Sequence, residues 1–138
     1  MNITLHTDGG ARGNPGPAGI GGVLEWIGKD HKKHILPFSE FIGHATNNQA
    51  EYRALLLGLS KAQEVGATEV DAYLDSELVA KQCSREYKIK NADLQTLFLK
   101  VWNHIVTFKA VRFHTIPREK NREADRLVNE AIDHGGAL

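Results

Sequence analysis

Apolar and polar positions alternate along the first residues of the chain. Ile3, Leu5 and Thr7 alternate with polar neighbours as far as Asp8, and a period of two with β-branched residues predicts a strand. Residues 9–19 are rich in glycine and proline and predict a tight loop with exposed backbone. An acid between a rigid strand and an accessible loop is well placed for chemistry, although Asp-Gly is also a common turn pair.

Similar apolar runs predict four further strands. They are residues 20–27, 34–41, 70–74 and 110–116. Residues 28–30 (GKD) are typical of the turn of a hairpin between the first two of these runs. Pro37 places the third strand of the chain at a sheet edge, because proline cannot donate a hydrogen bond to a neighbouring strand.

Four segments have the composition or the three-and-four apolar spacing of helices. They are residues 49–65, preceded by the capping side chains of residues 46–48, then 76–83, 92–107 and 122–134. The order is therefore three strands, a helix, a strand, two helices, a strand and a helix. A helix between two strands favours a right-handed crossover and a parallel strand pair.

Composition sets limits on the class of protein. A chain of 138 residues with 41% hydrophobic residues fits a single domain spanning residues 1–138. Its 17 basic and 17 acidic residues cancel, so an anionic partner must be held by local contacts rather than by an overall field. The lone Cys83 cannot form an internal disulfide and suits a small buried position. Without a leader or membrane-spanning pattern, we expect a soluble cytoplasmic protein with no membrane association and no obligate protein partner.

Four acids occupy the positions that carry candidate chemistry. Asp8 and Asp75 end strands, whereas Glu51 and Asp125 lie in the first turns of helices. If the two strands are adjacent and parallel, their acids leave the sheet at one edge, and a cluster of carboxylates must then share protons or bind cations. Hard oxygen ligands favour magnesium or manganese, and two such ions suit phosphodiester chemistry. Each acid alone also fits a solvated charge or a helix cap, so the hypothesis depends on the set.

The segments around these acids resemble the four motifs of the ribonuclease H type 1 family. They read TDGGARGNPGPAG, TNNQAEYRAL, DSELV and REKNREADRLVNEA. The resemblance covers nearly the whole chain in the family's order. It implies an α/β fold with a five-stranded mixed sheet and helices on both faces. It also implies metal-dependent endonucleolytic hydrolysis of the RNA strand of an RNA–DNA hybrid, leaving 5′-phosphate and 3′-hydroxyl ends.

The resemblance also assigns a metal site. By position, the catalytic and metal-binding carboxylates are Asp8, Glu51, Asp75 and Asp125. They would hold two magnesium ions, for which manganese can substitute. Asp8 would bridge the two ions, and Asp125 would help to hold the ion that activates water. Glu51 and Asp75 would help to hold the ion that faces the leaving 3′-oxygen.

Five further positions match substrate contacts of the family. Asn14, Asn47, Asn48 and Gln49 match residues that read the minor groove and the 2′-hydroxyls of RNA. Thr46 matches a pocket for a phosphate of the DNA strand. Thr46 and Asn47 equally suit the capping of the following helix, and one residue can do both.

The sequence departs from the better-known family pattern in three places. Where many members have a catalytic histidine this chain has Thr115 beside His114, and the following loop carries Arg118, as in archaeal-like sequences. We expect Arg118 rather than His114 to assist turnover. Glu77 replaces a common glutamine, and the basic handle is reduced to residues 85–90, which either contact phosphate or form a solvated loop. Weak substrate binding is therefore expected.

Two other functions remain open from the sequence. A related nuclease of the same superfamily, such as a 3′-exonuclease or a resolvase, would also need four carboxylates, although the NNQAEY and GNPGPAG segments argue against it. A non-catalytic nucleic-acid-binding module would share the fold, but the complete set of acids argues against the loss of activity.

Overall fold

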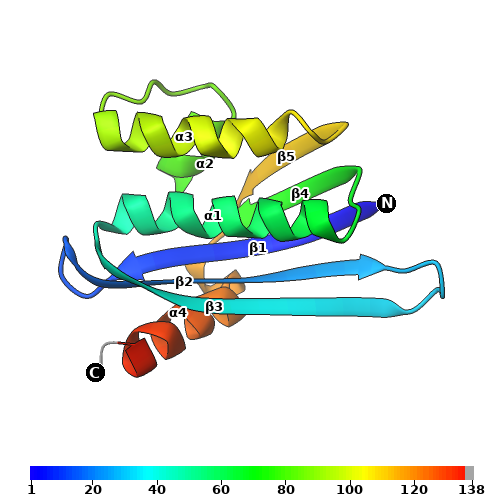
Figure 1. The fold of residues 1–138 in the computed structure, drawn as a ribbon, viewed down its shortest axis with the longest axis horizontal. Coiled ribbons are helices and arrows are strands. Elements are labelled where there is room, and N and C mark those ends of the chain that lie inside the picture. The colour runs from blue at the N-terminus through cyan, green and yellow to red at the C-terminus, as the bar shows by residue number, and fades with distance from the viewer. Residues whose placement is uncertain (136–138) are drawn as a thin grey trace.

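A five-stranded mixed sheet forms the centre of the molecule, and the computed structural model describes residues 1–135. The strands are β1 (Asn2–Ala11), β2 (Gly16–Ile27), β3 (Lys33–Ala45), β4 (Glu69–Leu74) and β5 (Ala110–Thr115). Their order in the sheet is β3-β2-β1-β4-β5 (Figure 1). The first three strands are antiparallel, and β4 and β5 run parallel to β1. The expected mixed sheet is confirmed, and Pro37 does lie in an edge strand.

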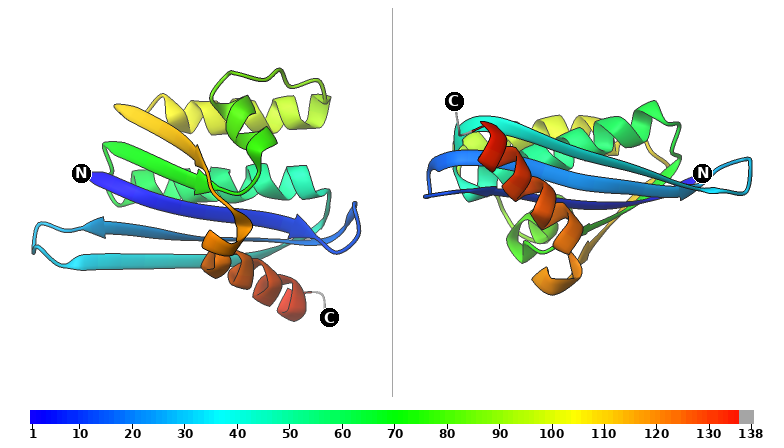
Figure 2. Two further views of the ribbon diagram at one scale, coloured as in Figure 1. Left: turned by 180° about the vertical axis from the view of Figure 1, so that it is seen from behind. Right: turned by 90° about the horizontal axis from the view of Figure 1, so that it is seen from below.

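Helices cover both faces of this sheet. They are α1 (Asn47–Glu64), α2 (Glu77–Cys83), α3 (Ala92–Ile105) and α4 (Arg122–Gly135), with a short 3₁₀ helix, η1 (Arg118–Lys120), before the last. Helices α1 and α3 lie together on one face, and α4 crosses the other (Figures 1 and 2). The η1 turn lies in a segment that the sequence predicts as loop. No helix within residues 1–135 has the length and apolar character needed to cross a bilayer.

The helices begin where the sequence places capping side chains. Thr46 Oγ1 accepts a hydrogen bond from the Gln49 backbone N–H, and Gln49 Oε1 accepts one from the Thr46 backbone N–H. This reciprocal pair satisfies two N–H groups that lack partners within a helix. Ser76 and Asn91 cap α2 and α3 in the simpler one-sided way.

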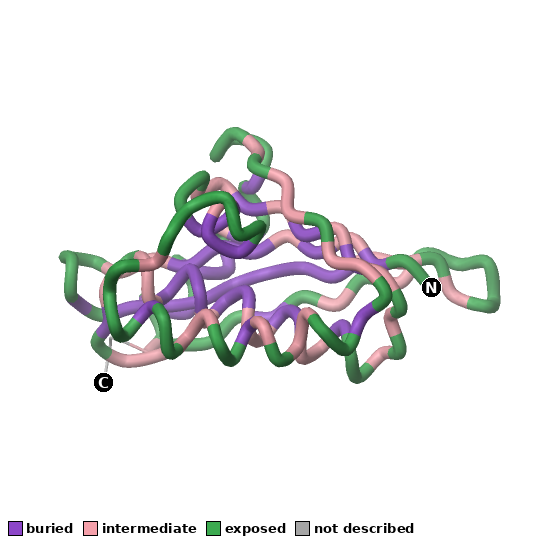
Figure 3. Tube along the Cα trace, turned by 90° about the horizontal axis from the view of Figure 1, so that it is seen from above, coloured by how far each residue is buried: buried purple, intermediate pink, exposed green. Residues whose placement is uncertain are grey.

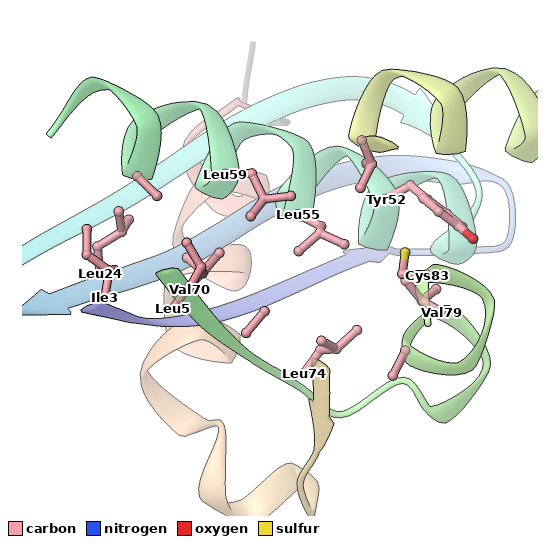
Figure 4. Packing of buried hydrophobic residues seen from close by; sticks show 14 of the residues in the cluster. Ile3, Leu5, Leu24, Tyr52, Leu55, Leu59, Val70, Leu74, Val79 and Cys83 are labelled. Atoms are coloured by element: carbon pink, nitrogen blue, oxygen red, sulfur yellow. The ribbon is translucent and has the colours of Figure 1, made fainter. Parts of the chain in front are cut away.

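The main core lies between the sheet and α1, as the buried central strands indicate (Figures 3 and 4). Ile3 and Leu5, the alternating apolar residues of β1, pack in one fully buried cluster with Leu55 and Leu59 of α1. Cys83 is also buried in this cluster, as expected. Helix α3 contributes less than its apolar spacing suggests. Only Leu94 and Val101 of α3 are buried. The other apolar residues at the three-and-four spacing are half-exposed, namely Leu97, Phe98, Trp102 and Ile105.

The glycine-rich segment corrects one expectation. Strand β1 continues through Ala11, and β2 begins at Gly16, so most of the predicted loop is a paired hairpin. The glycines permit close helix packing instead of irregular backbone. A Cβ atom on Gly9 would overlap the backbone of Ala50 in α1, and one on Gly21 would lie 2.7 Å from the Ala124 carbonyl oxygen of α4. Helix α1 can therefore approach β1, the strand that carries Asp8, and α4 can approach the neighbouring strand β2.

Candidate active site

Two acids lie just beyond the point where the parallel strands β1 and β4 separate. The pairing of β1 with β4 runs from Asn2–Glu69 to His6–Tyr73 and ends there. Asp8 lies two residues beyond the last pair in β1, and Asp75 lies two residues beyond it in the chain that follows β4. Because the two strands are parallel and each acid lies two residues past the last pair, both carboxylates lie at the same end of the sheet. The expected adjacent, parallel arrangement is confirmed.

Helix α1 brings a third acid to this edge. Because Gly9 lets α1 approach β1, the backbone N–H of Gly9 lies 3.3 Å from Glu51 Oε1 and 3.0 Å from Asp8 Oδ1. Ligand oxygens of Asp8, Glu51 and Asp75 all lie within 4.8 Å of one another. Three carboxylates from β1, α1 and the end of β4 thus meet in one place.

The fourth acid faces the same pocket from α4. Asp125 and the three clustered acids line a pocket of about 460 Å³, but Asp125 is outside the group within 4.8 Å. Its carboxylate Oδ1 accepts a long hydrogen bond of 3.4 Å from a guanidinium nitrogen of Arg118 on η1. The Arg118 side chain, 78% exposed, also lines the pocket. The four predicted carboxylates and Arg118 therefore share one pocket, with three acids in close contact.

Burial and crowding oppose the ionisation of the clustered acids. Burial raises the pKa of Asp8 to about 6, and the nearby charges of Asp75 and Asp125 act in the same direction. Burial also raises the pKa of Glu51 well above its ordinary value, with Asp8 as the next cause. The pKa of Asp75 is raised by burial too, although a hydrogen bond from Asn121 opposes this shift. Without a counter-charge, the cluster holds protons at a pH where exposed acids have lost them.

This cluster has the chemistry of a divalent cation site. Glu51 Oε2 is buried and has no hydrogen-bond partner among residues 1–135, so a lone pair points into the protein without compensation. A cation would satisfy that oxygen and relieve the repulsion between the acids. The ligand atoms are all carboxylate oxygens, which favour magnesium or manganese over softer metals.

Two of the predicted substrate residues also hold the hairpin against α1. Asn47 Oδ1 accepts a hydrogen bond of 2.8 Å from the Ala11 backbone N–H, and Asn14 Oδ1 accepts one of 3.0 Å from the Asn47 backbone N–H. Both side-chain oxygens are engaged within the protein, and the amide NH2 groups are the remaining polar groups of these two side chains. Asn47 and Asn48 line the carboxylate pocket.

Thr46 and Gln49 form the capping box of α1. The structure therefore confirms the capping role of Thr46 and leaves its contact with a DNA phosphate as a prediction. Gln49 is half-buried, and its side-chain oxygen is engaged with the Thr46 backbone.

His114 belongs to a different cluster. Its ring stacks on Tyr73 with centroids 4.6 Å apart, and its Nε2 lies 2.9 Å from Asp71 Oδ1. Arg112 binds the same carboxylate and holds the pKa of Asp71 well below its ordinary value. His114 lies in β5, as expected, and it is not among the residues that line the carboxylate pocket.

The reduced basic segment is partly packed. The Arg85 guanidinium lies 5.9 Å from the ring centroid of Phe98 and 5.3 Å from that of Trp102, both on α3. Such cation–π contacts favour a fixed arginine over a freely solvated one.

Glu77, which replaces a common glutamine of the family, is exposed in the first turn of α2.

Two residues of the site were missed from the sequence. Arg12 lines the pocket and pairs with Asp133 of α4 at 2.6 Å, but in the sequence it lies within a run that predicts a tight loop with exposed backbone. Asn121 is buried beside Asp75, whereas its position directly before a helix predicts only a cap. In both cases the sequence offered one signal of a role in the site, which is that a polar residue lies within a segment that carries a candidate acid.

Comparison with known proteins identifies the family. A family model described as reverse transcriptase-like matches residues 6–131. The ribonuclease H of Lachnoclostridium phytofermentans is 33% identical over 152 residues, an alignment that covers 98% of this chain and 94% of that protein. The chain belongs to the type 1 ribonuclease H family. Its similarity extends to curated mycobacterial relatives at 43% identity, of whose length the chain spans 36%.

Solved ribonucleases H share the fold closely. The crystal structure of RNase H1 from the archaeon Halobacterium salinarum has a TM-score of 0.88 at 35% identity, covering 97% of this chain and 99% of that one. LC11-RNase H1, which was solved in complex with an RNA/DNA hybrid, has a TM-score of 0.86 at 43% identity. That match covers 96% of this chain and 98% of that one. The expected ribonuclease H fold and the archaeal-like resemblance are confirmed.

Proposed function

We propose that this chain is a metal-dependent endonuclease that hydrolyses the RNA strand of RNA–DNA hybrids by a two-metal-ion mechanism. The products would carry 5′-phosphate and 3′-hydroxyl ends. The observation that carries the proposal is the cluster of Asp8, Glu51 and Asp75 within 4.8 Å in a pocket that also holds Asp125. The solved complex of the related LC11 enzyme with a hybrid supports the choice of substrate.

The four acids of the pocket would hold two divalent cations, magnesium in the first instance. Bound there, such ions supply the activation of water and the stabilisation of the leaving oxygen. The orphaned Oε2 of Glu51 and the raised pKa values of Asp8 and Glu51 support a cation at this place. All are features that a bound positive charge would relieve.

The neighbouring residues would bind and orient the hybrid. Asn14, Asn47 and Asn48 line or adjoin the pocket and can donate amide N–H groups to the minor groove and to 2′-hydroxyls. Gln49 and Thr46, at the start of α1, would contact the hybrid minor groove and a phosphate of the DNA strand respectively. Arg118 would hold the scissile phosphate or help the product to leave, because its guanidinium keeps its charge.

The test is cleavage of an end-labelled RNA–DNA hybrid with magnesium or manganese, and then with chelator. We expect cutting that needs the metal, and loss of cutting in Asp8→Asn and Asp75→Asn while circular dichroism shows an intact fold. Asp71→Asn is the matched control, since Asp71 is an acid of β4 outside the pocket. It should retain activity at temperatures where it is folded.

Three outcomes would contradict the proposal. Full cleavage by either folded pocket variant would remove the acids from the chemistry. Efficient cutting of an all-DNA duplex would favour a related nuclease of the superfamily. Binding of hybrid with no cleavage under any metal would favour a non-catalytic binding module.

A further inference from the structure

One buried side chain fills the gap between the strands that carry Asp8 and Asp75. The β1–β4 ladder ends at His6–Tyr73, so Thr7 of β1 lies beyond the last paired residue. The Asn121 Nδ2 donates a hydrogen bond of 2.8 Å to the carbonyl oxygen of Thr7 and lies 3.5 Å from Asp75 Oδ2. The amide therefore bridges the two strands where their own hydrogen bonds have stopped.

The backbone of Asn121 links the same point to α4. Its carbonyl oxygen accepts a hydrogen bond of 3.1 Å from the N–H of Asp125, and its own N–H donates one of 2.9 Å to the carbonyl oxygen of Arg118. One residue thus contacts the segments that carry three of the four acids, and also the turn that carries Arg118. A shift of Asn121 would move these groups relative to one another.

The burial of this amide has a free-energy cost. Asn121 is 2% exposed, and its Oδ1 is a buried oxygen without a hydrogen-bond partner among residues 1–135. An apolar residue of similar size would avoid that unsatisfied oxygen. A conventional helix cap would direct this side chain to the first turn of α4, whereas its Nδ2 turns away to Thr7 and Asp75. These contacts indicate a role in the site and not in starting the helix.

We propose that Asn121 is a positioning residue that fixes the separation of the Asp8 and Asp75 carboxylates and thereby sets the affinity of the pocket for divalent cations. The inference rests on the proposed function, in which those carboxylates hold the cations. Side chains that orient metal ligands by hydrogen bonds commonly change metal affinity by roughly ten- to a hundred-fold when they are removed.

The test is isothermal titration of magnesium, and separately of manganese, into the metal-free protein. We compare the native chain with Asn121→Ala, which removes the amide, and Asn121→Leu, which removes it while keeping a branched side chain with the same number of heavy atoms. Both variants should bind the cation at least about ten-fold more weakly. In cleavage assays, both should need correspondingly more magnesium for half-maximal rate, while the KM for hybrid at saturating magnesium stays near the native value.

Asn91→Ala is the matched control. Asn91 also directly precedes a helix, and its Oδ1 caps α3 by accepting a hydrogen bond of 3.1 Å from the Leu94 N–H. It lies outside the carboxylate pocket, so its loss should lower the melting temperature without changing cation affinity. Circular dichroism fixes a titration temperature at which every variant is folded, and Asn121→Leu serves if the cavity left by alanine prevents folding.

The outcomes separate this inference from the proposed function. If the native chain binds cations and folded Asn121→Leu binds them equally well, the amide does not position the ligands and only this inference fails. An equal loss of affinity in Asn91→Ala would attribute the effect to general destabilisation and would also overturn it. If the native chain binds no divalent cation, the metal site of the proposed function fails, and this inference fails with it.

Discussion

Asp8 and Glu51 lie where burial opposes their charge, and their pKa values are raised for that reason. A raised acid pKa means that folding favours the protonated form. Below the unfolded pKa, at about pH 4, the acid is protonated in both states and carries no penalty. As the pH rises through about 6, the folded pKa of Asp8, the unfolded chain is increasingly favoured. The metal-free protein should therefore be less stable at neutral pH than its packing alone allows.

Asp8→Asn should stabilise the metal-free protein at neutral pH. The amide of the variant keeps an oxygen that can accept the hydrogen bond from the Gly9 N–H. The substitution also removes a negative charge whose burial is unfavourable. We expect a gain of about 1–3 kcal/mol in the free energy of unfolding at pH 7.5, and almost none at pH 4. Urea unfolding in the presence of chelator measures both values. Equal or lower stability of Asp8→Asn at pH 7.5 would show that burial and the neighbouring acids do not oppose the charge of Asp8.

Arg118 and His114 offer a second comparison of single residues. Arg118 lines the carboxylate pocket, whereas His114 is hydrogen-bonded to Asp71 outside it. If Arg118 contacts the scissile phosphate as proposed, Arg118→Ala should lower kcat by roughly ten-fold or more with a smaller change in KM, because it would remove a charge-assisted hydrogen bond from the transition state. His114→Ala should leave both near native, and the pH–rate profile should lack a histidine step near neutrality. A folded His114→Ala enzyme that loses most of its rate, beside an active Arg118→Ala enzyme, would reverse these roles.

The packing of elements determines how closely the acids meet. Helix α1 carries Glu51 and contacts β1 at Gly9, where backbone lies against backbone. Helix α4 carries Asp125 and contacts β2 in the same way at Gly21. The glycines of the first hairpin therefore affect the candidate active site through the spacing of its helices, although they carry no reactive group.

Gly9→Ala should damage both stability and catalysis. Its Cβ would overlap the Ala50 backbone, so α1 must move away from β1 and take Glu51 with it. Overpacking of this kind costs about 1–3 kcal/mol, and urea unfolding together with cleavage rates will measure both effects. Gly10→Ala is the control, since the nearest atom to its new Cβ lies at 3.8 Å in ordinary contact. A tolerated Gly9→Ala variant, or equal damage from both, would show that this contact does not set the helix position.

The whole molecule has balanced charge, with 17 basic and 17 acidic residues. Long-range attraction to a polyanion is then weak, and binding depends on the few cations at the site, such as Arg12 and Arg118. One of the larger basic clusters of the sequence, residues 85–90, has Arg85 committed to the rings of Phe98 and Trp102. Affinity for hybrid should therefore be modest and only weakly dependent on salt.

The salt dependence of hybrid binding tests this view. For Asp8→Asn, which the proposed function expects to bind hybrid without cutting it, fluorescence anisotropy should give a plot of log K against log salt with a slope of about −2 to −4, since each phosphate contact contributes about −0.9. A slope steeper than about −6 would require a wider basic surface than the pocket provides. The same titration with an all-DNA duplex should show weaker binding, because the asparagines that we propose to contact 2′-hydroxyls would find none there.

Much of the fold follows from the sequence because its signals are local. Period-two alternation gave the strands, capping side chains gave the helix starts, and the helix between strands indicated the parallel pair that brings Asp8 and Asp75 to one edge. The predicted end of the first strand was wrong. Glycines that suggest a loop in isolation are paired residues of a hairpin, and their lack of a side chain lets two helices pack closely against it.

The candidate site divides in the same way. The types and order of the four acids were readable from the motifs, since ligand chemistry depends on residue identity. Tertiary structure alone decided that Asp8, Glu51 and Asp75 meet within 4.8 Å while Asp125 lies farther off, and that His114 binds Asp71 outside the pocket. It also placed Asn121 between β1 and Asp75, across 114 and 46 residues of sequence. Such contacts depend on strand register and helix packing, which no local pattern of residues encodes.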